Sequence, residues 1–366
     1  MKTIDVPTLR AWLDDRKAVT VLDVRTDTDY AEWCIPNSVH VNAYEALKAN
    51  DPNALAGVSL PQETPVVTVC GAGSMSMRAA EQLAERGYEV YSLEGGMKAW
   101  SLAWNSAELP TAASTQVVQV RRTGKGCLSY LVGSDGVAAV IDASLPPDVY
   151  RQLADEHGWQ ITQVIETHIH ADHLSRARQL TEQTGAALIL PNNRRVSFPF
   201  TPVRDGETVT IGTARLLAVH TPGHTWESTS YVLDEAVLFT GDTLFLSSIG
   251  RPDLHASEDE GRTKAHALYH SLQYLVQLAP TLVVLPAHTS TPIAFDTTPI
   301  GAPLGEVIKQ TPLLREDEEP FVATLLARIG ATPPNFLEIV ALNEHGELPS
   351  GDPTELEAGA NRCAVA

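Results

Sequence analysis

The sequence predicts an α/β protein built from two domains, and three observations support this. The chain has 366 residues, whereas a typical domain has about 150. In the first 105 residues short apolar strands alternate with helical patterns, which is typical of a parallel sheet flanked by helices on both faces. From residue 116 onward, apolar strands ending in His or Asp are separated by helical stretches. We expect domains at 1–105 and 116–345, a linker at 106–115 and a C-terminal tail at 346–366.

The first domain opens with a strand and then a helix in MKTIDVPTLRAWLDD. The apolar runs VTVLDVR, PVVTVC and YEVYSL are rich in β-branched residues and predict strands at 19–25, 65–70 and 88–93. The segment MRAAEQLAERG predicts a helix at 77–87. In NSAELPTAAST, small and polar residues flank a Pro and the periodicity lapses, so we place the linker there.

The second domain begins with the strand VVQVRR and a β-hairpin, because CLSYLVGSDGVAAVIDAS has two apolar runs around a Ser-Asp-Gly turn. The patterns LSRARQLTEQTG and RTKAHALYHSLQYLVQL predict helices between the later strands. From about Gly301 the chain is rich in Pro, Gly and acidic residues, and one helical pattern occurs at 318–330. The later strands are expected at 162–168, 186–191, 214–220, 230–242 and 281–288.

The composition excludes several classes of partner. The chain has 45 Asp and Glu against 26 Lys and Arg, a net charge of −19, and no basic run. Neutralising phosphates needs clustered cations, so we expect neither a nucleic-acid surface nor an anionic-membrane surface. The N-terminus lacks the apolar core of a signal peptide, and no stretch of about 18 apolar residues could span a membrane. We expect a cytoplasmic protein.

The four cysteines are too few and too scattered to staple a chain of this size, and none forms a CxxC pair. We expect free thiols. Cys34 and Cys127 are expected to pack in the interior. The sequence leaves the role of Cys363 open, either as an exposed thiol or as one that covers a pocket.

Potential metal ligands are most concentrated in the segment THIHADHLSRA, directly after an apolar strand. This segment holds His168, His170, Asp172 and His173, and alternate residues of an extended segment share a face. Burying four such polar groups together costs several kcal/mol unless they are paired or bind a metal. Three further donors follow at the ends of later strands: His224 in PGHT, Asp242 in FTGD and His288 in PAHT. The pattern predicts a metal site.

These four spaced motifs resemble the metallo-β-lactamase fold superfamily, over about residues 117–288. The resemblance implies an αββα sandwich with metals at one edge of its two sheets. The reaction stays open at this level, since zinc hydrolases, lactonases, glyoxalase II enzymes and persulfide dioxygenases share these ligands.

Two segments resemble persulfide dioxygenases in particular: GRPD after FTGDTLF, and the later TPPNFLEIVALN. The resemblance implies one Fe(II) per chain held by His168, His224 and Asp242. Two imidazoles and one carboxylate form a facial triad that leaves positions open for substrate sulfur and O₂. Arg251 and Asp253 would either support this site or form an ordinary turn ion pair. The remaining donors would line an emptied second site; these are His170, Asp172, His173 and His288.

A second constellation surrounds Cys70, which ends an apolar strand and opens the segment CGAGSMS before a helix. Converging backbone N–H groups and the helix dipole stabilise a thiolate or persulfide at such a position, although a buried structural Cys fits the same local pattern. LDVRTDTDYAEWCIPNS, the Cys70 loop and LEGGMKAW together resemble the rhodanese domain, over residues 1–104. The resemblance makes Cys70 the nucleophile, with its outer sulfur cradled by Gly71, Ala72, Gly73, Ser74 and Met75.

The chain departs from the rhodanese pattern where Met75 replaces the usual basic residue of the loop, which predicts weak turnover of thiosulfate. WCIPNS also stands where GHIPGA is common. A phosphatase-like reading, which needs an Arg to grip phosphate, is disfavoured.

Together these resemblances predict an enzyme of sulfur metabolism. It would oxidise glutathione persulfide, or another low-molecular-weight persulfide, with O₂ to sulfite and thiol, and Cys70 would transfer sulfur to or from thiosulfate, sulfite and thiols. The alternative is a dinuclear zinc thioester hydrolase of the glyoxalase II type, or a lactonase, with a rhodanese-like accessory module. A third hypothesis is that the first domain has no enzymatic activity and acts only as a sulfur-sensing or docking module. By analogy with related dioxygenases, we expect a homodimer.

Overall fold

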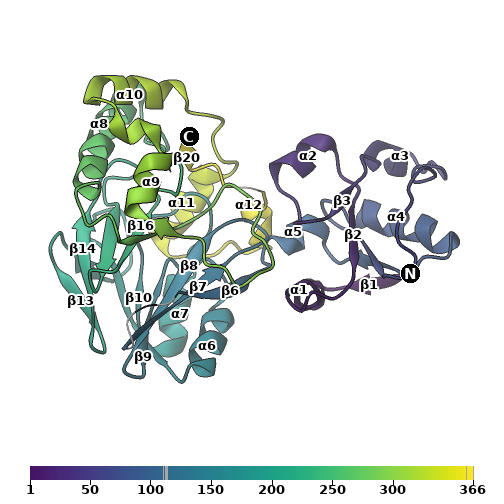
Figure 1. Ribbon diagram of the computed structural model, residues 1–366, viewed down its shortest axis with the longest axis horizontal. Coiled ribbons are helices and arrows are strands. Elements are labelled where there is room, and N and C mark those ends of the chain that lie inside the picture. The colour runs from purple at the N-terminus through teal and green to yellow at the C-terminus, as the bar shows by residue number, and fades with distance from the viewer. Residues whose placement is uncertain (110, 112–113, 360, 366) are drawn as a thin grey trace.

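The computed structural model describes residues 1–109, 111, 114–359 and 361–365. The chain forms two bodies that lie side by side, a smaller N-terminal one and a larger C-terminal one (Figure 1). The yellow C-terminal segment returns to the junction of the two (Figure 1). Among the described residues, none of the helices combines the length and apolar character that a membrane span requires.

The N-terminal domain is a five-stranded parallel sheet flanked by helices, as expected. The strand order is β1-β5-β4-β2-β3. Helix α1 begins where the Asp5 carboxylate accepts the N–H of Thr8 (2.9 Å), which satisfies one of the free donors of a helix N-terminus. The strands are β1 (Lys2–Ile4), β2 (Thr20–Asp23), β3 (Val39–His40), β4 (Val66–Val69) and β5 (Val90–Leu93). The helices are α1 (Val6–Asp14), α2 (Asp27–Glu32), α3 (Tyr44–Lys48), α4 (Ser74–Glu85) and α5 (Gly96–Trp100).

The C-terminal domain is a sandwich of two sheets with helices on both outer faces, which confirms the predicted fold class. The larger sheet has the order β12-β11-β10-β9-β8-β7-β6 and the smaller one β13-β14-β15-β16-β18-β19. Its strands are β6 (Asn105–Leu109), β7 (Thr115–Arg121), β8 (Leu128–Ser134), β9 (Val137–Ile141), β10 (Gln160–Ile165), β11 (Ala187–Pro191), β12 (Thr201–Val203), β13 (Thr208–Ile211), β14 (Ala214–His220), β15 (Thr229–Leu233), β16 (Val237–Gly241), β18 (Val283–Pro286) and β19 (Ala302–Pro303). A pair of short strands, β17 (Ile249–Gly250) and β20 (Ala364–Val365), joins the chain terminus to this domain.

Three hydrophobic layers hold the sandwich together. Side chains such as Tyr130, Ile141 and Phe239 fill the space between the sheets, and each is at most 1% exposed. A second cluster packs α6 (Pro147–Glu156) and α7 (Ala177–Thr184) on the larger sheet, and a third packs α8 (Glu258–Leu275), α9 (Leu304–Gln310) and α10 (Glu318–Ala327) on the smaller one. Burying each large apolar side chain stabilises the fold by about 1.5–3 kcal/mol.

The expected hairpin at Ser134-Asp135-Gly136 is present. Strands β8 and β9 pair antiparallel, and Asp135 and Gly136 both have positive φ, as a tight two-residue turn requires. Residues 106–109 of the expected linker belong instead to β6, which pairs with β7 in the larger sheet. Residues 110, 112 and 113 of that linker lie outside the described residues.

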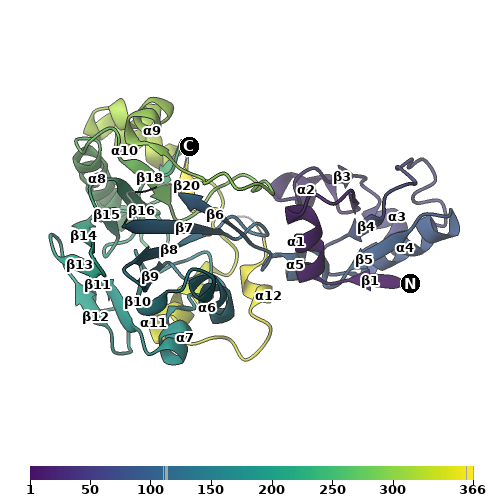
Figure 2. The same cartoon turned by 60° about the horizontal axis from the view of Figure 1, so that its bottom comes forward.

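The last 65 residues contain more helix than the single pattern we expected. Besides α10, they form α9, α11 (Phe336–His345) and α12 (Thr354–Glu357). Helix α12 lies between the two bodies beside α5 (Figure 2). The C-terminal residues therefore belong to the packed structure of the second domain.

Candidate functional site

Four strand ends bring the predicted metal ligands to one edge of the sandwich. His168 follows β10, His224 follows β14, Asp242 directly follows β16 and His288 follows β18. All four side chains are 1% exposed. The four residues are spread over 120 positions of the sequence, from His168 to His288. They meet because the strand ends that carry them converge, as the sequence predicted.

His168, His224 and Asp242 form one compact group. The Nε2 atoms of His168 and His224 lie 3.7 and 3.6 Å from Oδ2 of Asp242. Within the described part of the chain, these ring nitrogens and both Asp242 oxygens are buried without a hydrogen-bond partner. Each buried unsatisfied polar group costs about 1–3 kcal/mol, which a shared cation would offset. Two imidazoles and a carboxylate fit Fe(II) or Zn²⁺.

Neighbouring groups fix the tautomers of both imidazoles. His224 Nδ1 donates to the carbonyl of Arg251 (2.8 Å). His168 Nδ1 donates to the Thr167 hydroxyl (2.8 Å), which itself donates to Asp142 (2.8 Å). In each ring the Nε2 lone pair therefore faces Asp242. Such partners around a metal ligand orient the ring and raise its basicity.

Electrostatics keep the three groups in the states that metal binding needs. Burial lowers the pKa of His168 and His224, so both imidazoles are neutral at pH 7. Burial alone would raise the pKa of Asp242, but His288 and His168 beside it outweigh that effect and hold the pKa below its usual range. The carboxylate is thus ionised while both ring nitrogens can donate a lone pair.

The donors of the expected second site divide into separate groups. The rings of His168, His170 and His173 are neighbours, with centroids 4.2 Å apart for each successive pair. His170 Nε2, however, faces Glu166 (2.7 Å) and Asp142 (3.2 Å). Although burial opposes it, these carboxylates raise the pKa of His170, so it forms a buried ion-paired cluster.

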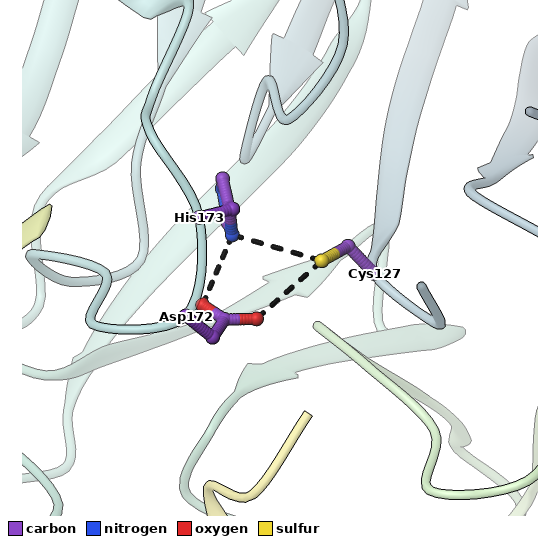
Figure 3. Close-up of side chains that lie close together, drawn as sticks. All are labelled: Cys127, Asp172 and His173. Carbon is purple, nitrogen blue, oxygen red and sulfur yellow. Dashed lines mark hydrogen bonds and ion pairs between the residues drawn. The ribbon is translucent and has the colours of Figure 1, made fainter. Parts of the chain in front are cut away.

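Asp172 and His173 lie beside Cys127, a thiol that we expected only to pack in the interior. Figure 3 shows the three side chains as a triangle. Cys127 Sγ lies 3.4 Å from Asp172 Oδ2 and 3.8 Å from His173 Nδ1, and the ring and carboxylate lie 3.0 Å apart. Burial and the Asp172 charge raise the pKa of Cys127, so the thiol is protonated.

His288 lies near both Asp242 and Cys363 of the C-terminal segment. Its Nε2 lies 3.3 Å from Asp242 Oδ2, and its ring lies against that of Phe245 with centroids 4.2 Å apart and the planes tilted by 35°. Donor atoms of Asp242, His288 and Cys363 all lie within 4.8 Å of one another, and Cys363 is fully buried. Cys363 is therefore not the exposed thiol that was one of the two roles left open by the sequence.

Two side chains that sequence reasoning did not single out also shape the site. Asn343 Nδ2 on α11 donates to the carbonyls of His170 and His173, 2.9 Å each. Asn361 lies beside Cys127, with Nδ2 3.6 Å from Sγ. Asn343 is the last residue of the motif TPPNFLEIVALN, so that motif was the available signal for it.

Arg251 and Asp253 form an ion pair, and Arg251 also supports the metal site. These were the two roles that the sequence left open. Their ion pair is bidentate, with two N–O distances of 2.8 Å. The Arg251 backbone carbonyl orients His224, and its guanidinium donates to the carbonyl of Arg362 in the C-terminal segment (3.0 Å). This residue therefore links a ligand of the site to the chain terminus.

A cavity of about 420 Å³ opens beside His288. Phe245 and Ile293 supply apolar surface, and Arg121 lies at one side, paired with Asp296 at 2.9 Å. Most of the polar side chains are uncharged hydroxyls: Ser247, Ser248, Thr289, Ser290, Thr291 and Thr298. Of the seven predicted donors, His288 is the one that lines this cavity.

In the N-terminal domain, Cys70 lies between β4 and α4, as predicted. Its Sγ accepts the N–H of Gly73 (3.1 Å) and lies 3.5 Å from the Ser76 hydroxyl. Met75 is in the first turn of α4 and its side chain packs in the hydrophobic core, so it can contribute only backbone to a sulfur site. Ser74, Gly71 and Ala72 complete the turn. A thiol at a helix N-terminus is placed to carry negative charge.

The Cys70 turn requires a glycine at position 96. Gly96 has φ +57°, and a Cβ there would lie 2.2 Å from the Cys70 carbonyl oxygen. We expect Gly96→Ala to displace the turn and to reduce sulfur transfer by at least about ten-fold. Gly57→Ala is the matched control, since a Cβ at Gly57 meets no atom within 4 Å. Sulfur transfer at the normal rate in Gly96→Ala would show that the turn tolerates a side chain.

Glu357 of α12 anchors the C-terminal segment in the interior. Its carboxylate is fully buried, pairs with Arg122 (3.1 Å) and Arg176 (3.2 Å), and accepts the N–H of Leu174 (2.6 Å). Burial alone would raise its pKa, but the two guanidinium groups lower it below the ordinary value of 4.5. Its stabilising contribution is therefore complete above pH 4.5 and is lost as the pH falls through the lowered pKa.

We expect Glu357→Gln to lower the free energy of unfolding of the second domain by about 3 kcal/mol at pH 7, because it leaves two buried cations unpaired. Denaturant titrations at pH 7 and pH 3 measure this, and the difference between variant and parent should shrink at pH 3. Glu338→Gln on the exposed face of α11 is the control and should change little. Equal loss at both pH values would mean that the carboxylate charge is not what stabilises the segment.

Comparison with known proteins agrees with this architecture. Residues 5–103 match the family model of the rhodanese-like domain, and residues 122–288 match that of the metallo-β-lactamase superfamily. A hydroxyacylglutathione hydrolase of Rhodopseudomonas palustris is 36% identical over 132 residues, which span 35% of this chain and 51% of that protein. One from Brucella ovis is 32% identical over 207 residues, which span 54% of this chain and 76% of that protein.

Two solved structures are also similar. A metallo-β-lactamase from Staphylococcus aureus has a TM-score of 0.58 and 28% identity, covering 64% of this chain and 73% of its own. ETHE1 from Myxococcus xanthus has a TM-score of 0.53 and 26% identity, covering 66% of this chain and 98% of its own. The chain therefore belongs to the metallo-β-lactamase superfamily and carries a rhodanese-like domain at its N-terminus.

Proposed function

We propose that the protein is an iron-dependent persulfide dioxygenase joined to a sulfurtransferase domain. The observation that carries this is the group of His168, His224 and Asp242, whose donor atoms face one another without a hydrogen-bond partner among the described residues. Two of the other donors have partners of their own: His170 Nε2 faces two carboxylates, and His173 Nδ1 lies beside Asp172 and Cys127. A two-histidine, one-carboxylate set suits Fe(II) with open positions. The structural similarity to ETHE1 also supports a persulfide dioxygenase.

When bound, Fe(II) would bring persulfide sulfur and O₂ together, and the substrate itself supplies the four electrons. The residues of this chain hold the geometry for that reaction. Thr167 and Arg251 fix the imidazole rings, and the closed surroundings keep bulk water from the reacting sulfur. The products would be sulfite and the free thiol.

The cavity beside His288 suits a small thiol carrier. Its hydroxyl groups can hydrogen-bond amide and carboxylate groups of a molecule such as glutathione, and Phe245 gives an apolar wall for the sulfur. We assign the carrier of the persulfide to this cavity, with its sulfur end directed to His288.

The Cys70 site supports rhodanese-type sulfur transfer. Attack of the Cys70 thiolate on a sulfane sulfur forms a Cys70 persulfide, and the donor leaves as its thiolate or, from thiosulfate, as sulfite. Since the core-facing Met75 supplies no cation, we expect persulfides to be better donors than thiosulfate.

A thioester hydrolase is the second candidate function. The name hydroxyacylglutathione hydrolase, which recurs among the similar proteins, favours it. That chemistry uses two metals and a bridging hydroxide. It would require Asp172, His173 and His288 to hold a second ion in place of their contacts with Cys127 and Cys363.

Metal analysis, together with assays of oxygen uptake and of thioester hydrolysis, distinguishes the dioxygenase from the hydrolase. Protein purified without oxygen should contain about one iron per chain, as a single facial triad can hold. The iron form should consume O₂ with glutathione persulfide, and the zinc form should not. Two zinc ions per chain together with rapid hydrolysis of a glutathione thioester would establish the hydrolase instead.

A further inference from the structure

The turn that joins β7 to β8, residues 122–127, is bound to the N-terminal domain. The Nε–H of Arg122 donates to the carbonyl of Ser101 (2.6 Å). The carbonyl of the next residue, Thr123, accepts the indole N–H of Trp33 (3.2 Å). Arg122 and Thr123 are fully buried, and Trp33 is 3% exposed. The turn therefore lies in the interior, between the two domains.

Trp33 is the first residue of WCIPNS, the segment that departs from the common rhodanese pattern GHIPGA. A glycine at this position has no side chain that could reach Thr123. The backbone of Trp33 is held within its own domain by Arg25, whose guanidinium donates to the Trp33 carbonyl (2.7 Å) and pairs with Asp23 (2.7 Å). The indole is therefore anchored in one domain and hydrogen-bonded to the other.

The Trp33 ring also packs on Gly126. A Cβ at Gly126 would lie 2.9 Å from Cη2 of the ring and 2.6 Å from the carbonyl oxygen of Thr289, so only a glycine fits between them. The Gly126 carbonyl accepts the Thr289 N–H (2.9 Å). Thr289 directly follows His288, and Cys127 pairs with His288 in an isolated β-bridge. A single glycine thus separates the indole from the backbone next to His288.

The chain after His288 forms one wall of the cavity described above. Residues 289–294 all line that cavity. The next residue, Phe295, packs against the hydrophobic core of the N-terminal domain, where its ring lies against Trp100 with centroids 6.0 Å apart. The N-terminal domain therefore holds this wall at both ends, through Gly126 at its start and through Phe295 at its end.

We propose that the N-terminal domain shapes the persulfide cavity of the second domain and that Trp33 is the positioning residue. This inference rests on the proposed function, which places the persulfide carrier in that cavity. Trp33 acts through other residues: it holds the turn at 122–127, the turn holds Thr289, and Thr289 fixes the wall beside His288. The N-terminal domain would then serve persulfide binding in addition to sulfur transfer at Cys70.

The proposed iron ligands are held by other contacts. His168 and His224 follow β10 and β14, and their rings are oriented by the Thr167 hydroxyl and by the Arg251 carbonyl. A shift of the cavity wall should therefore leave the iron in place and weaken the binding of the persulfide. Displacing a substrate-positioning group by about 1 Å can cost up to about a hundred-fold in rate.

The test replaces Trp33 by leucine in the full chain. Leucine keeps an apolar side chain in the core but removes the indole N–H and the ring that packs on Gly126. We expect the KM for glutathione persulfide to rise about ten-fold, with kcat within about two-fold of the parent and the iron content unchanged. Trp12→Leu is the matched control, because the Trp12 ring contacts Tyr91 of its own domain (centroids 5.6 Å apart).

Hydrogen exchange gives a second readout that does not depend on activity. The Thr289 amide should exchange at least about ten-fold faster in Trp33→Leu than in the parent or in Trp12→Leu, because the turn that binds it opens more easily. Sulfur transfer by Cys70 at the parent rate shows that the N-terminal domain is folded in the variant. If that transfer is lost, Trp33→Phe, which keeps an aromatic ring in the core, replaces Trp33→Leu with the same expected directions.

Three results would overturn the inference and leave the proposed function as it is. These are unchanged exchange at Thr289 in the Trp33 variant, faster exchange with an unchanged KM, and an equal rise in KM in Trp12→Leu. A different result separates the two proposals. If Thr289 exchanges faster in the variant but the iron-loaded parent chain consumes no O₂ with glutathione persulfide, Trp33 positions the wall and the proposed function is the part that fails.

Discussion

Asp242→Ala is expected to lose its metal and at least about 4 kcal/mol of transition-state stabilisation, or about a thousand-fold in oxygen uptake. Asp242 is the single carboxylate of the group, and its Oδ2 lies 3.3–3.7 Å from the Nε2 atoms of three imidazoles, those of His168, His224 and His288. Removing it leaves three buried imidazoles with no anion among them. Iron content per chain and the rate of oxygen uptake measure the effect.

His266→Ala is a suitable control for that change. His266 lies on α8 and pairs with Glu318 at 2.7 Å, away from the metal ligands. It should keep its iron and its rate. Full metal content in Asp242→Ala would contradict the assigned ligand set, and loss of metal in His266→Ala would mean that the assay reports on stability and not on coordination.

Cys70→Ser is expected to abolish sulfur transfer from glutathione persulfide to an added thiol. The hydroxyl keeps nearly the same volume and can accept the Gly73 N–H, but it cannot form a persulfide. The fold should survive, so the circular dichroism spectrum and the iron content should match the parent. The measurement is release of labelled sulfur to the acceptor thiol.

Cys34→Ser provides the comparison within the same domain, because Cys34 is only partly buried and lies next to the core residue Trp33. It should transfer sulfur at the parent rate. Transfer that persists in Cys70→Ser would support the third reading of the sequence, in which the first domain only senses sulfur or docks a partner.

Strand patterns allowed much of this architecture to be predicted. β14 occupies the expected 214–220, and the ends of β10, β14, β16 and β18 carry the metal donors as expected. This succeeds because apolar strands with terminal polar residues are local signals, and parallel packing brings strand ends to one edge.

The prediction was incomplete where residues leave regular structure. Residues 168–173 follow β10 in a series of turns, so the alternation of an extended strand does not apply and His170 turns to Asp142 and Glu166. Cys127 and Cys363 join the site through contacts between residues far apart in the sequence, such as Asn361 with Cys127, which are 234 positions apart. The local periodicity of a sequence gives no information about contacts between residues so far apart.

The structure of the C-terminal segment was likewise not predicted from local sequence patterns. Its composition is rich in Pro, Gly and acidic residues, and we expected only a C-terminal tail at 346–366. The tertiary partners of Glu357, namely Arg122 and Arg176, fix it in place instead. A buried carboxylate is stable only when such partners are present, and single-sequence reasoning does not identify them.

The central claim is that this metal centre oxidises a persulfide. The most direct measurement is oxygen consumption by the iron-loaded chain on addition of a known amount of glutathione persulfide, with sulfite determined at the end. We predict equimolar use of O₂ and persulfide and an equal yield of sulfite. Unchanged oxygen with intact persulfide, in protein shown to contain its iron, would contradict the account.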